Sequence, residues 1–249
     1  MIRLVTRADD IGCAISANKA AYDATTQGIL RNYSLLACAH ELEDAAQRLL
    51  GLEGVNFGLH ASVTSEWDQP RWQPVAPAEQ VPALCSPDGA MYQNVQDVHD
   101  AKAPAEQVLT EIKAQLARLR KVGFKVSYMD THMGFAWLEG VDDALRELAQ
   151  KEGLVYRPKV DRAPKVGWDE MDCAGSMVKM LKALPDDGTF LIVGHPMYDD
   201  AETRSFGRSE ESGEHIALTR NGQREMFMRP DVVAVARERE IQPTCYDQI

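Results

Sequence analysis

The feature that most constrains the fold of this chain is an alternation of short β-branched runs with longer segments of helical periodicity. The runs predict strands at residues 2–6, 29–37, 55–60, 126–130, 154–157, 190–193 and 244–246. Strands that alternate with helices form parallel βα units, because a helix returns the chain to the start of the next strand. The sequence therefore predicts an α/β protein of about seven strands, either a distorted or incomplete TIM-like (β/α) barrel or an open doubly wound sheet.

Helical periodicity fills most of the intervals between these runs. It predicts helices at residues 16–26, 41–50, 141–152, 171–184 and 231–240. The most regular pattern begins at Pro104 and ends at Gly123, and proline and glycine are typical of a helix start and a helix end. Its apolar positions repeat every three or four residues at Val108, Ile112, Leu116 and Leu119.

Residues 61–104 depart from the alternation. Six of the twelve prolines lie in this segment, together with Trp67 and Trp72. A loop of this length inside a compact domain is uncommon and is usually either functional or disordered. The two tryptophans favour the functional explanation, so we treat residues 1–249 as one domain that carries a long insertion loop.

Composition excludes several classes of partner. The chain has 38 acidic and 27 basic side chains and a formal net charge of −11, which argues against binding to nucleic acid or to anionic membranes. No run of 18 apolar residues predicts a membrane span. The five cysteines are scattered without a C-x-x-C pair, and the amino terminus reaches a charge at Arg3 without a long apolar stretch. We therefore expect a cytoplasmic protein.

Polar side chains stand where several predicted strands end, which is where parallel α/β proteins bind their ligands. In chain order these residues are Asp9 and Asp10 after the first strand, His60 at the third, Asp130 and His132 at the fourth, and His195 at the sixth. Taken singly, an Asp-Asp pair is more often a turn and a lone histidine is more often a core residue. Their coincidence at equivalent strand ends favours one functional site. Asp9 and Asp10 can share it only if the chain leaves β geometry by Asp10, since neighbouring strand residues point to opposite sides.

Such a set has the chemistry of a divalent metal site. One carboxylate and two neutral imidazoles bind Zn²⁺ or a similar ion and leave a position for water. A second acid and a third histidine beside them can act as general base and general acid. The pattern therefore predicts a metal-dependent hydrolase.

The four tryptophans all fall in segments that follow predicted strands, on the same rim as these acids and histidines. They are Trp67, Trp72, Trp137 and Trp168. Buried packing explains any one of them, but an amphipathic ring at the mouth of a pocket also suits the apolar face of a sugar. We therefore expect a carbohydrate substrate.

Several short motifs run in order along nearly the whole chain. They are Ala8-Asp9-Asp10-Ile11-Gly12, Gly58-Leu59-His60 with Thr64, Val81-Pro82-Ala83-Leu84 with Asp88-Gly89, Met129-Asp130-Thr131-His132, Gly194-His195-Pro196 and Cys245-Tyr246-Asp247. In this order they make the chain similar to the YdjC-like carbohydrate deacetylases, a family that includes chitin disaccharide deacetylase and the hopanoid-associated HpnK-type enzymes.

The resemblance implies a TIM-like barrel with fewer than eight regular strands and hydrolysis of an N-acetyl group on a sugar, which yields acetate and an amine. It implies one divalent metal ion, Zn²⁺ or Mg²⁺, and assigns Asp10, His60 and His132 as its ligands. Asp9 would be the catalytic base, and His195 would be the acid at the leaving nitrogen.

Some expectations remain open beside this assignment. We expect Asp130 to orient His132 or His195 through a hydrogen bond to the ring. The substrate would be a small acetylated amino sugar or a short oligosaccharide, and a homo-oligomer is left open. The alternatives are hydrolysis of another bond, such as an O-acetyl ester or a phosphoester, and a non-catalytic sugar-binding relative.

The sequence departs from the family pattern at three positions. Gly134 stands where members commonly have a second histidine, Arg7 stands where many have asparagine, and Gly194 replaces a common cysteine. These changes leave the implied metal ligands intact, but they weaken the expectation that diacetylchitobiose is the substrate.

Overall fold

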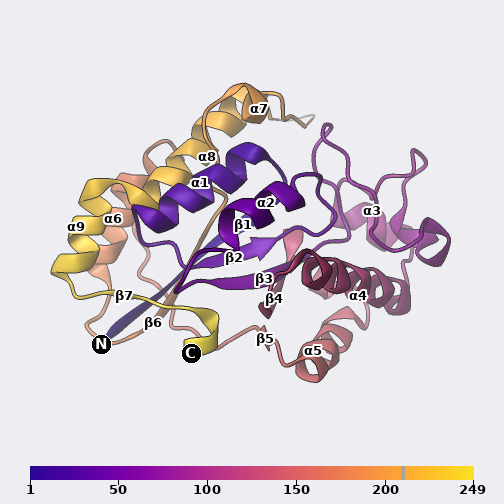
Figure 1. Cartoon of the computed structure of the whole chain (residues 1–249), viewed down its shortest axis with the longest axis horizontal. Helices are drawn as coiled ribbons and strands as arrows, with labels where there is room; N and C mark the ends of the chain where they lie inside the picture. Colours follow the sequence, from indigo (N-terminus) through magenta and orange to yellow (C-terminus); the bar gives the residue numbers. More distant parts are fainter. Residues whose placement is uncertain (209–210) are drawn as a thin grey trace.

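The computed structural model describes residues 1–208 and 211–249 as a curled sheet with helices packed around it (Figure 1). The strands are β1 (Ile2–Ile11), β2 (Asn32–Leu35), β3 (Asn56–Ala61), β4 (Val126–Thr131), β5 (Val155–Tyr156), β6 (Gly188–Gly194) and β7 (Gln242–Pro243). Their order is β5-β4-β3-β2-β1-β6, with β7 beside β1, and every pairing among them is parallel. The predicted α/β class is confirmed.

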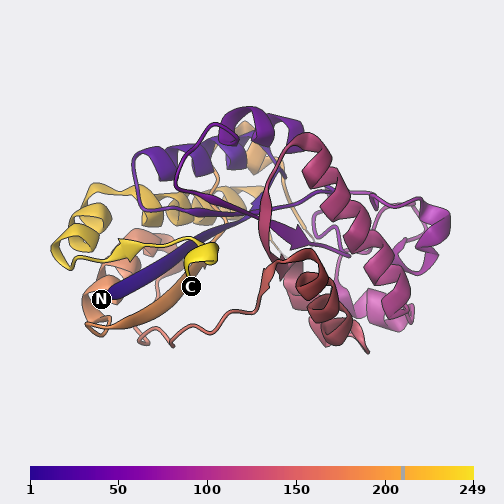
Figure 2. The ribbon, with the colours of Figure 1, turned by 60° about the horizontal axis from the view of Figure 1, so that its bottom comes forward.

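The sheet curls into a half-barrel, as Figure 2 shows. Strand β1 is paired on one edge with β6 along residues 2–8. Its other edge pairs first with β7, at Arg3 and Leu4, and then with β2 from Arg7 onward. On the open side, the Asp161 amide donates a hydrogen bond of 2.6 Å to the Thr189 carbonyl, so the chain after β5 reaches β6. The prediction of a distorted TIM-like barrel is confirmed, and the open doubly wound sheet is not observed.

Helices cover the outside of this half-barrel. They are α1 (Ile15–Thr26), α2 (Leu42–Leu49), α3 (Val95–Asp100), α4 (Ala105–Val122), α5 (Val141–Glu152), α6 (Cys173–Ala183), α7 (Ala201–Arg204), α8 (Gly213–Met228) and α9 (Pro230–Glu238). Helix α4 agrees with the sequence pattern: its four periodic apolar residues are buried, and Gly123 ends it in the left-handed conformation. Helices α7 and α8 are not among those that the sequence predicts. Among the described residues, none of the helices is long and apolar enough to cross a bilayer.

The bounds of β3, β4, β5 and β6 lie within two residues of the prediction, β2 is shorter than the predicted 29–37, and β1 and β7 differ as follows. Strand β1 continues five residues beyond residue 6, through Arg7, Asp9 and Asp10. In the sequence, these polar side chains indicate the end of a strand, because their partners are not known. In the fold they are buried or nearly so. The last strand, β7, ends before residues 244–246, because the chain turns into a short 3-10 helix at Tyr246–Gln248.

The insertion at residues 61–104 is a packed segment. It contains the 3-10 helices Ala78–Gln80 and Pro82–Leu84 as well as α3. The carboxylate of Glu111, a buried residue of α4, accepts hydrogen bonds from the backbone of Val75 and Ala76 at 2.9 and 2.8 Å. These bonds tie the insertion to the helix that follows it.

A small buried cluster inside the half-barrel joins β1, β4 and the 3-10 helix at Tyr246–Gln248. It consists of Val5, Tyr128 and Tyr246, and the two tyrosine rings stack with their centroids 4.1 Å apart. The Tyr246 hydroxyl accepts a hydrogen bond of 3.1 Å from Arg7, and the Tyr128 hydroxyl lies 3.1 Å from that of Ser34.

Candidate active site

Asp9 and Asp10 both reach the site because β1 is irregular at its end. The pairing of β1 with β2 shifts register between Ala8 and Ile11, and Asp10 has a φ of 62°. Aspartate and asparagine tolerate this left-handed conformation better than most residues. Because of this irregularity, Asp9 and Asp10 do not point to opposite sides as neighbouring residues of a regular strand do. The chain leaves β geometry by Asp10, which is the condition expected from the sequence for the two carboxylates to share one site.

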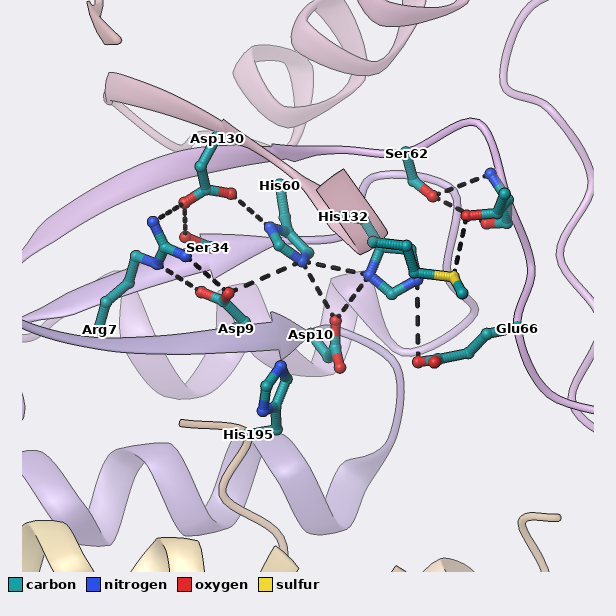
Figure 3. A network of polar contacts seen from close by, with 12 residues as sticks. Arg7, Asp9, Asp10, Ser34, His60, Ser62, Glu66, Asp130, His132 and His195 are labelled. Carbon is teal, nitrogen blue, oxygen red and sulfur yellow. Dashed lines mark hydrogen bonds and ion pairs between the residues drawn. The ribbon is translucent and has the colours of Figure 1, made fainter. Parts of the chain in front are cut away.

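Three of the predicted residues bring single donor atoms into contact (Figure 3). Asp10 Oδ1 lies 3.3 Å from His60 Nε2 and 3.1 Å from His132 Nδ1, and the two imidazole nitrogens are 3.2 Å apart. Asp10 comes from β1, His60 from β3, and His132 follows β4 directly. All three residues are at least 97% buried.

These three atoms fit a divalent metal ion. Ligands about 2.0–2.1 Å from Zn²⁺ at tetrahedral corners lie about 3.3 Å apart, and octahedral Mg²⁺ ligands at about 2.1 Å lie about 3.0 Å apart. The observed separations fall between these values. Asp10 Oδ1 is buried and accepts no hydrogen bond of good geometry, as expected of an atom that binds an ion. Burial raises the pKa of Asp10, but His132 and His60 outweigh it and hold the pKa well below its usual value. Asp10 is therefore ionised.

Arg7 joins two carboxylates on the other side of His60. Its Nε and Nη2 bind the two oxygens of Asp9 at 2.6 and 2.8 Å, and its Nη1 lies 2.8 Å from Asp130 Oδ2. Ser34 donates a further hydrogen bond of 2.5 Å to Asp130 Oδ2. Burial lowers the pKa of Arg7, but Asp130 and Asp9 outweigh this and raise it. Asp9 and Asp130 are thus paired with a permanent cation.

Asp130 orients a histidine, but not one of the two that the sequence suggests. Its Oδ1 forms a hydrogen bond with His60 Nδ1, whereas His132 and His195 were the expected partners. The reason is register: His60 and Asp130 are direct neighbours in the pairing of β3 with β4. The bond fixes the His60 ring with its Nε2 toward Asp10.

Burial lowers the pKa of His60, but the carboxylates of Asp9 and Asp130, the nearby Asp10 and the hydrogen bond to Asp130 outweigh it. In the protein without a metal ion, the pKa of His60 is therefore held well above its usual value.

His195 lies on the side of Asp9 and Asp10 opposite to His60 (Figure 3). The Oε1 atom of Gln223, on α8, accepts hydrogen bonds from the His195 backbone N–H at 2.7 Å and from its Nδ1 at 3.1 Å. Because an amide oxygen can only accept, Nδ1 carries a proton and Nε2 is left for the site. Burial, and then the charge of Arg220, lower the pKa of His195 despite the opposing effect of Asp10.

The sequence did not identify three side chains that complete the site. Arg7 was noted only as a departure from the family pattern, Gln223 lies on a helix that was not predicted, and Glu66 lies within the insertion. Glu66 is 7% exposed, and burial raises its pKa. The signal for Arg7 is a basic residue inside a buried strand next to two acids, which calls for an ion pair.

The four tryptophans divide into two pairs. Trp67 and Trp72 are fully buried, with Trp67 packed against Phe206 and Trp72 centred 6.1 Å from the His132 ring. A sugar could not stack on them without a rearrangement. Trp137 and Trp168 are 55% and 46% exposed. Trp137 ends the 3-10 segment that begins at His132, and it lines a cavity of about 730 Å³ together with His99, Asp100, Lys102 and Glu139.

The fold and the site together define a class of protein, namely an α/β half-barrel with one carboxylate and two imidazoles at the carboxyl ends of its strands. The chain belongs to the YdjC-like protein family, whose model matches residues 3–238. The family resemblance identified in the sequence is thereby confirmed.

Relatives that match this chain carry deacetylase names. A carbohydrate deacetylase of Thermoanaerobacter pseudethanolicus is 24% identical, over 98% of this chain and 97% of that protein. A chitooligosaccharide deacetylase of Proteus mirabilis is 26% identical, over 64% of this chain and 59% of that protein. The crystal structure of an Enterococcus faecalis V583 protein described as a cellobiose-phosphate cleavage protein is 19% identical with a TM-score of 0.81, covering 99% of this chain and 98% of the other. The last likeness supports the fold.

Proposed function

We propose that this protein is a metal-dependent hydrolase that removes an N-acetyl group from an amino sugar or a short oligosaccharide and releases acetate. The observation that carries the proposal is the meeting of Asp10 Oδ1, His60 Nε2 and His132 Nδ1 within 3.1–3.3 Å of one another. Asp9 and His195 lie beside these atoms. The deacetylase names of the relatives support the choice of bond and substrate class.

Asp10, His60 and His132 would hold the ion, Zn²⁺ or Mg²⁺. Such an ion, when bound, supplies a Lewis acid for the acetyl carbonyl and lowers the pKa of a coordinated water. Asp130 serves this arrangement by fixing the His60 ring. The ion would also offset the mutual repulsion of the buried acids around His60.

Asp9 is the group that accepts the proton of the attacking water. Arg7 holds both of its oxygens, and each oxygen retains a second lone pair that can take a proton. The arginine therefore fixes the position of the carboxylate without blocking it. One carboxylate oxygen of Asp9 lies 4.0 Å from His60 Nε2, which places the base next to the proposed ligand atoms.

His195 is the group that protonates the leaving nitrogen. An amine leaves an amide readily only after protonation, and a positioned acid supplies that proton. Gln223 directs His195 Nε2 toward the site by accepting from Nδ1. The lowered pKa makes the imidazolium a strong proton donor, at the cost of a small protonated fraction at neutral pH.

The cavity beside Trp137 is the proposed place for the rest of the sugar. Its exposed indole offers an apolar face, and Asp100, Lys102 and Glu139 offer hydrogen-bonding groups around it. Trp137→Ala should raise KM for acetylated oligosaccharides more than KM for the monosaccharide, with kcat nearly unchanged. Trp168→Ala is the parallel test of the second exposed ring, and unchanged KM values in both variants would remove the tryptophans from the substrate site.

The main test is acetate release from a panel of N-acetylated mono- and oligosaccharides, before and after chelation and after readdition of Zn²⁺ or Mg²⁺. We expect release that chelation abolishes and one metal restores. Release of acetate only from O-acetyl esters, or of phosphate from phosphoesters, would assign a different bond. Binding of acetylated sugar without any acetate formed would indicate a non-catalytic relative.

A further inference from the structure

We propose that Glu66 is a positioning residue for His132, and that it holds this imidazole in the tautomer whose Nδ1 is free to bind a metal ion. The proposal rests on the function proposed above, because it takes His132 as a ligand. It goes further by assigning a role to a side chain of the insertion that no motif marks.

Two buried polar atoms without partners face each other at this point. His132 Nε2 lies 3.8 Å from Glu66 Oε1, and neither atom has a hydrogen-bond partner. Both residues are at least 93% buried, so water does not freely replace the missing bond. A buried polar atom without a hydrogen bond costs folding free energy. Two such atoms facing each other therefore indicate a hydrogen bond that forms when the site binds a metal ion.

The tautomer of His132 follows from the atoms around its ring. Its Nδ1 lies 3.1 Å from Asp10 Oδ1 and 3.2 Å from His60 Nε2, at the place assigned to the metal. A neutral imidazole that binds a metal through Nδ1 must carry its proton on Nε2. That N–H points at Glu66, and a carboxylate acceptor there favours this tautomer and makes the ligand atom more basic.

Glu66 is itself held from the opposite side. Its other oxygen, Oε2, accepts a hydrogen bond of 3.1 Å from Arg208 Nη1. The neighbouring backbone is tied to the same segment, since the Asp68 amide donates to the Gly207 carbonyl at 2.8 Å. Oε1 is therefore the oxygen left for His132, and a movement of about 0.6–0.9 Å toward the ring completes the bond.

The test compares Zn²⁺ affinity and the His132 tautomer in three variants. Glu66→Leu removes the acceptor, and Glu66→Gln keeps the shape and an acceptor without the charge. Arg208→Met removes only the outer partner of Glu66. Affinity is measured by competition with a chromogenic chelator, and the tautomer by ¹⁵N NMR of the imidazole in the metal-free protein.

We expect Glu66→Leu to weaken Zn²⁺ binding by about 10–100-fold, Glu66→Gln to have a smaller effect, and Arg208→Met to have the smallest. The fraction of His132 protonated at Nε2 should fall in the same order. Unchanged affinity and tautomer in Glu66→Leu and Glu66→Gln would overturn the proposal. An equal loss in Arg208→Met would overturn it too, because Glu66 would then act only as an anchor of the chain.

A matched control is Glu111→Gln, which alters another buried glutamate that holds the same insertion but does not contact His132. It should leave Zn²⁺ affinity unchanged, and a loss equal to that of Glu66→Leu would count against a specific role for Glu66. If the natural protein binds Zn²⁺ but hydrolyses no acetylated sugar, the proposed function fails while these comparisons still decide the role of Glu66. If it binds no metal, the NMR measurement alone decides it.

Discussion

The two sides of the candidate site differ in how completely their polar groups are paired. On one side, Arg7 binds Asp9 and Asp130, and Asp130 binds His60 and Ser34. On the other side, Asp10 Oδ1, His132 Nε2 and Glu66 Oε1 are buried and lack a hydrogen-bond partner. Each such atom costs about 1–3 kcal/mol. The first side stabilises the fold, and the second keeps binding capacity for a ligand.

The largest expected effect distinguishes two neighbouring carboxylates: that of Asp10, on the side with unpaired atoms, and that of Asp9, on the side paired with Arg7. Asp10→Asn should lose metal and activity together, by more than the roughly 10–100-fold that loss of an outer partner causes. Asparagine tolerates the left-handed backbone at this position, so the change is confined to the carboxylate. Asp9→Asn should keep the metal and slow turnover by about 10²–10⁴-fold.

Metal content by mass spectrometry and kcat for acetate release check both variants. Equal loss of metal from the two would make Asp9 a ligand and leave the base unassigned.

The paired side is tested by removing its cation. Arg7→Met should lower the free energy of unfolding by about 3–5 kcal/mol, because the carboxylates of Asp9 and Asp130 would remain buried without their shared cation. Urea denaturation of the metal-free protein measures this loss. Arg3→Met, an exposed position on the same strand, is the control and should stay within about 0.5 kcal/mol of the natural protein. A similar small change in Arg7→Met would show that the ion pairs do not stabilise the fold.

The smallest expected effect concerns His195. In Gln223→Glu, a carboxylate would accept the Nδ1–H bond and stabilise the imidazolium, so the pKa of His195 should rise from its lowered value. Since the protonated ring is the proposed acid, activity should persist to higher pH than in the natural protein. NMR titration of the ring and the pH profile of kcat measure the two shifts. A raised pKa with an unmoved profile would remove His195 from proton transfer.

Local patterns in the sequence predicted the elements whose signals are local. Helix α4 could be predicted because its apolar stripe and its terminal residues are contained within one segment. Helix α8 lacks such a stripe: its central residues 219–223 are mostly polar, and Gln223 turns toward His195 instead of solvent. Its helical nature therefore depends on partners elsewhere in the chain.

The site shows the same limit. The strand-end rule brought Asp10, His60 and His132 to one place, because all parallel strands end on the same side of the sheet. The partner of Asp130 depends on the register between β3 and β4, and the role of Arg7 depends on β1 and β4 together. Neither can be read from spacing along a single segment.

The position of β1 has a consequence for biosynthesis. The strand that bears both aspartates is made before its partners, since one of its edges pairs with residues 188–194 and part of the other pairs with residues 242–243. Contacts between such distant segments close slowly during folding. The Arg7 side chain likewise gains its hydrogen bond to the Tyr246 hydroxyl only when the last residues of this sequence have emerged. A nascent chain thus carries its most charged strand with one edge unpaired until residues 188–194 have been made, and with part of the other edge unpaired until residues 242–243 have been made.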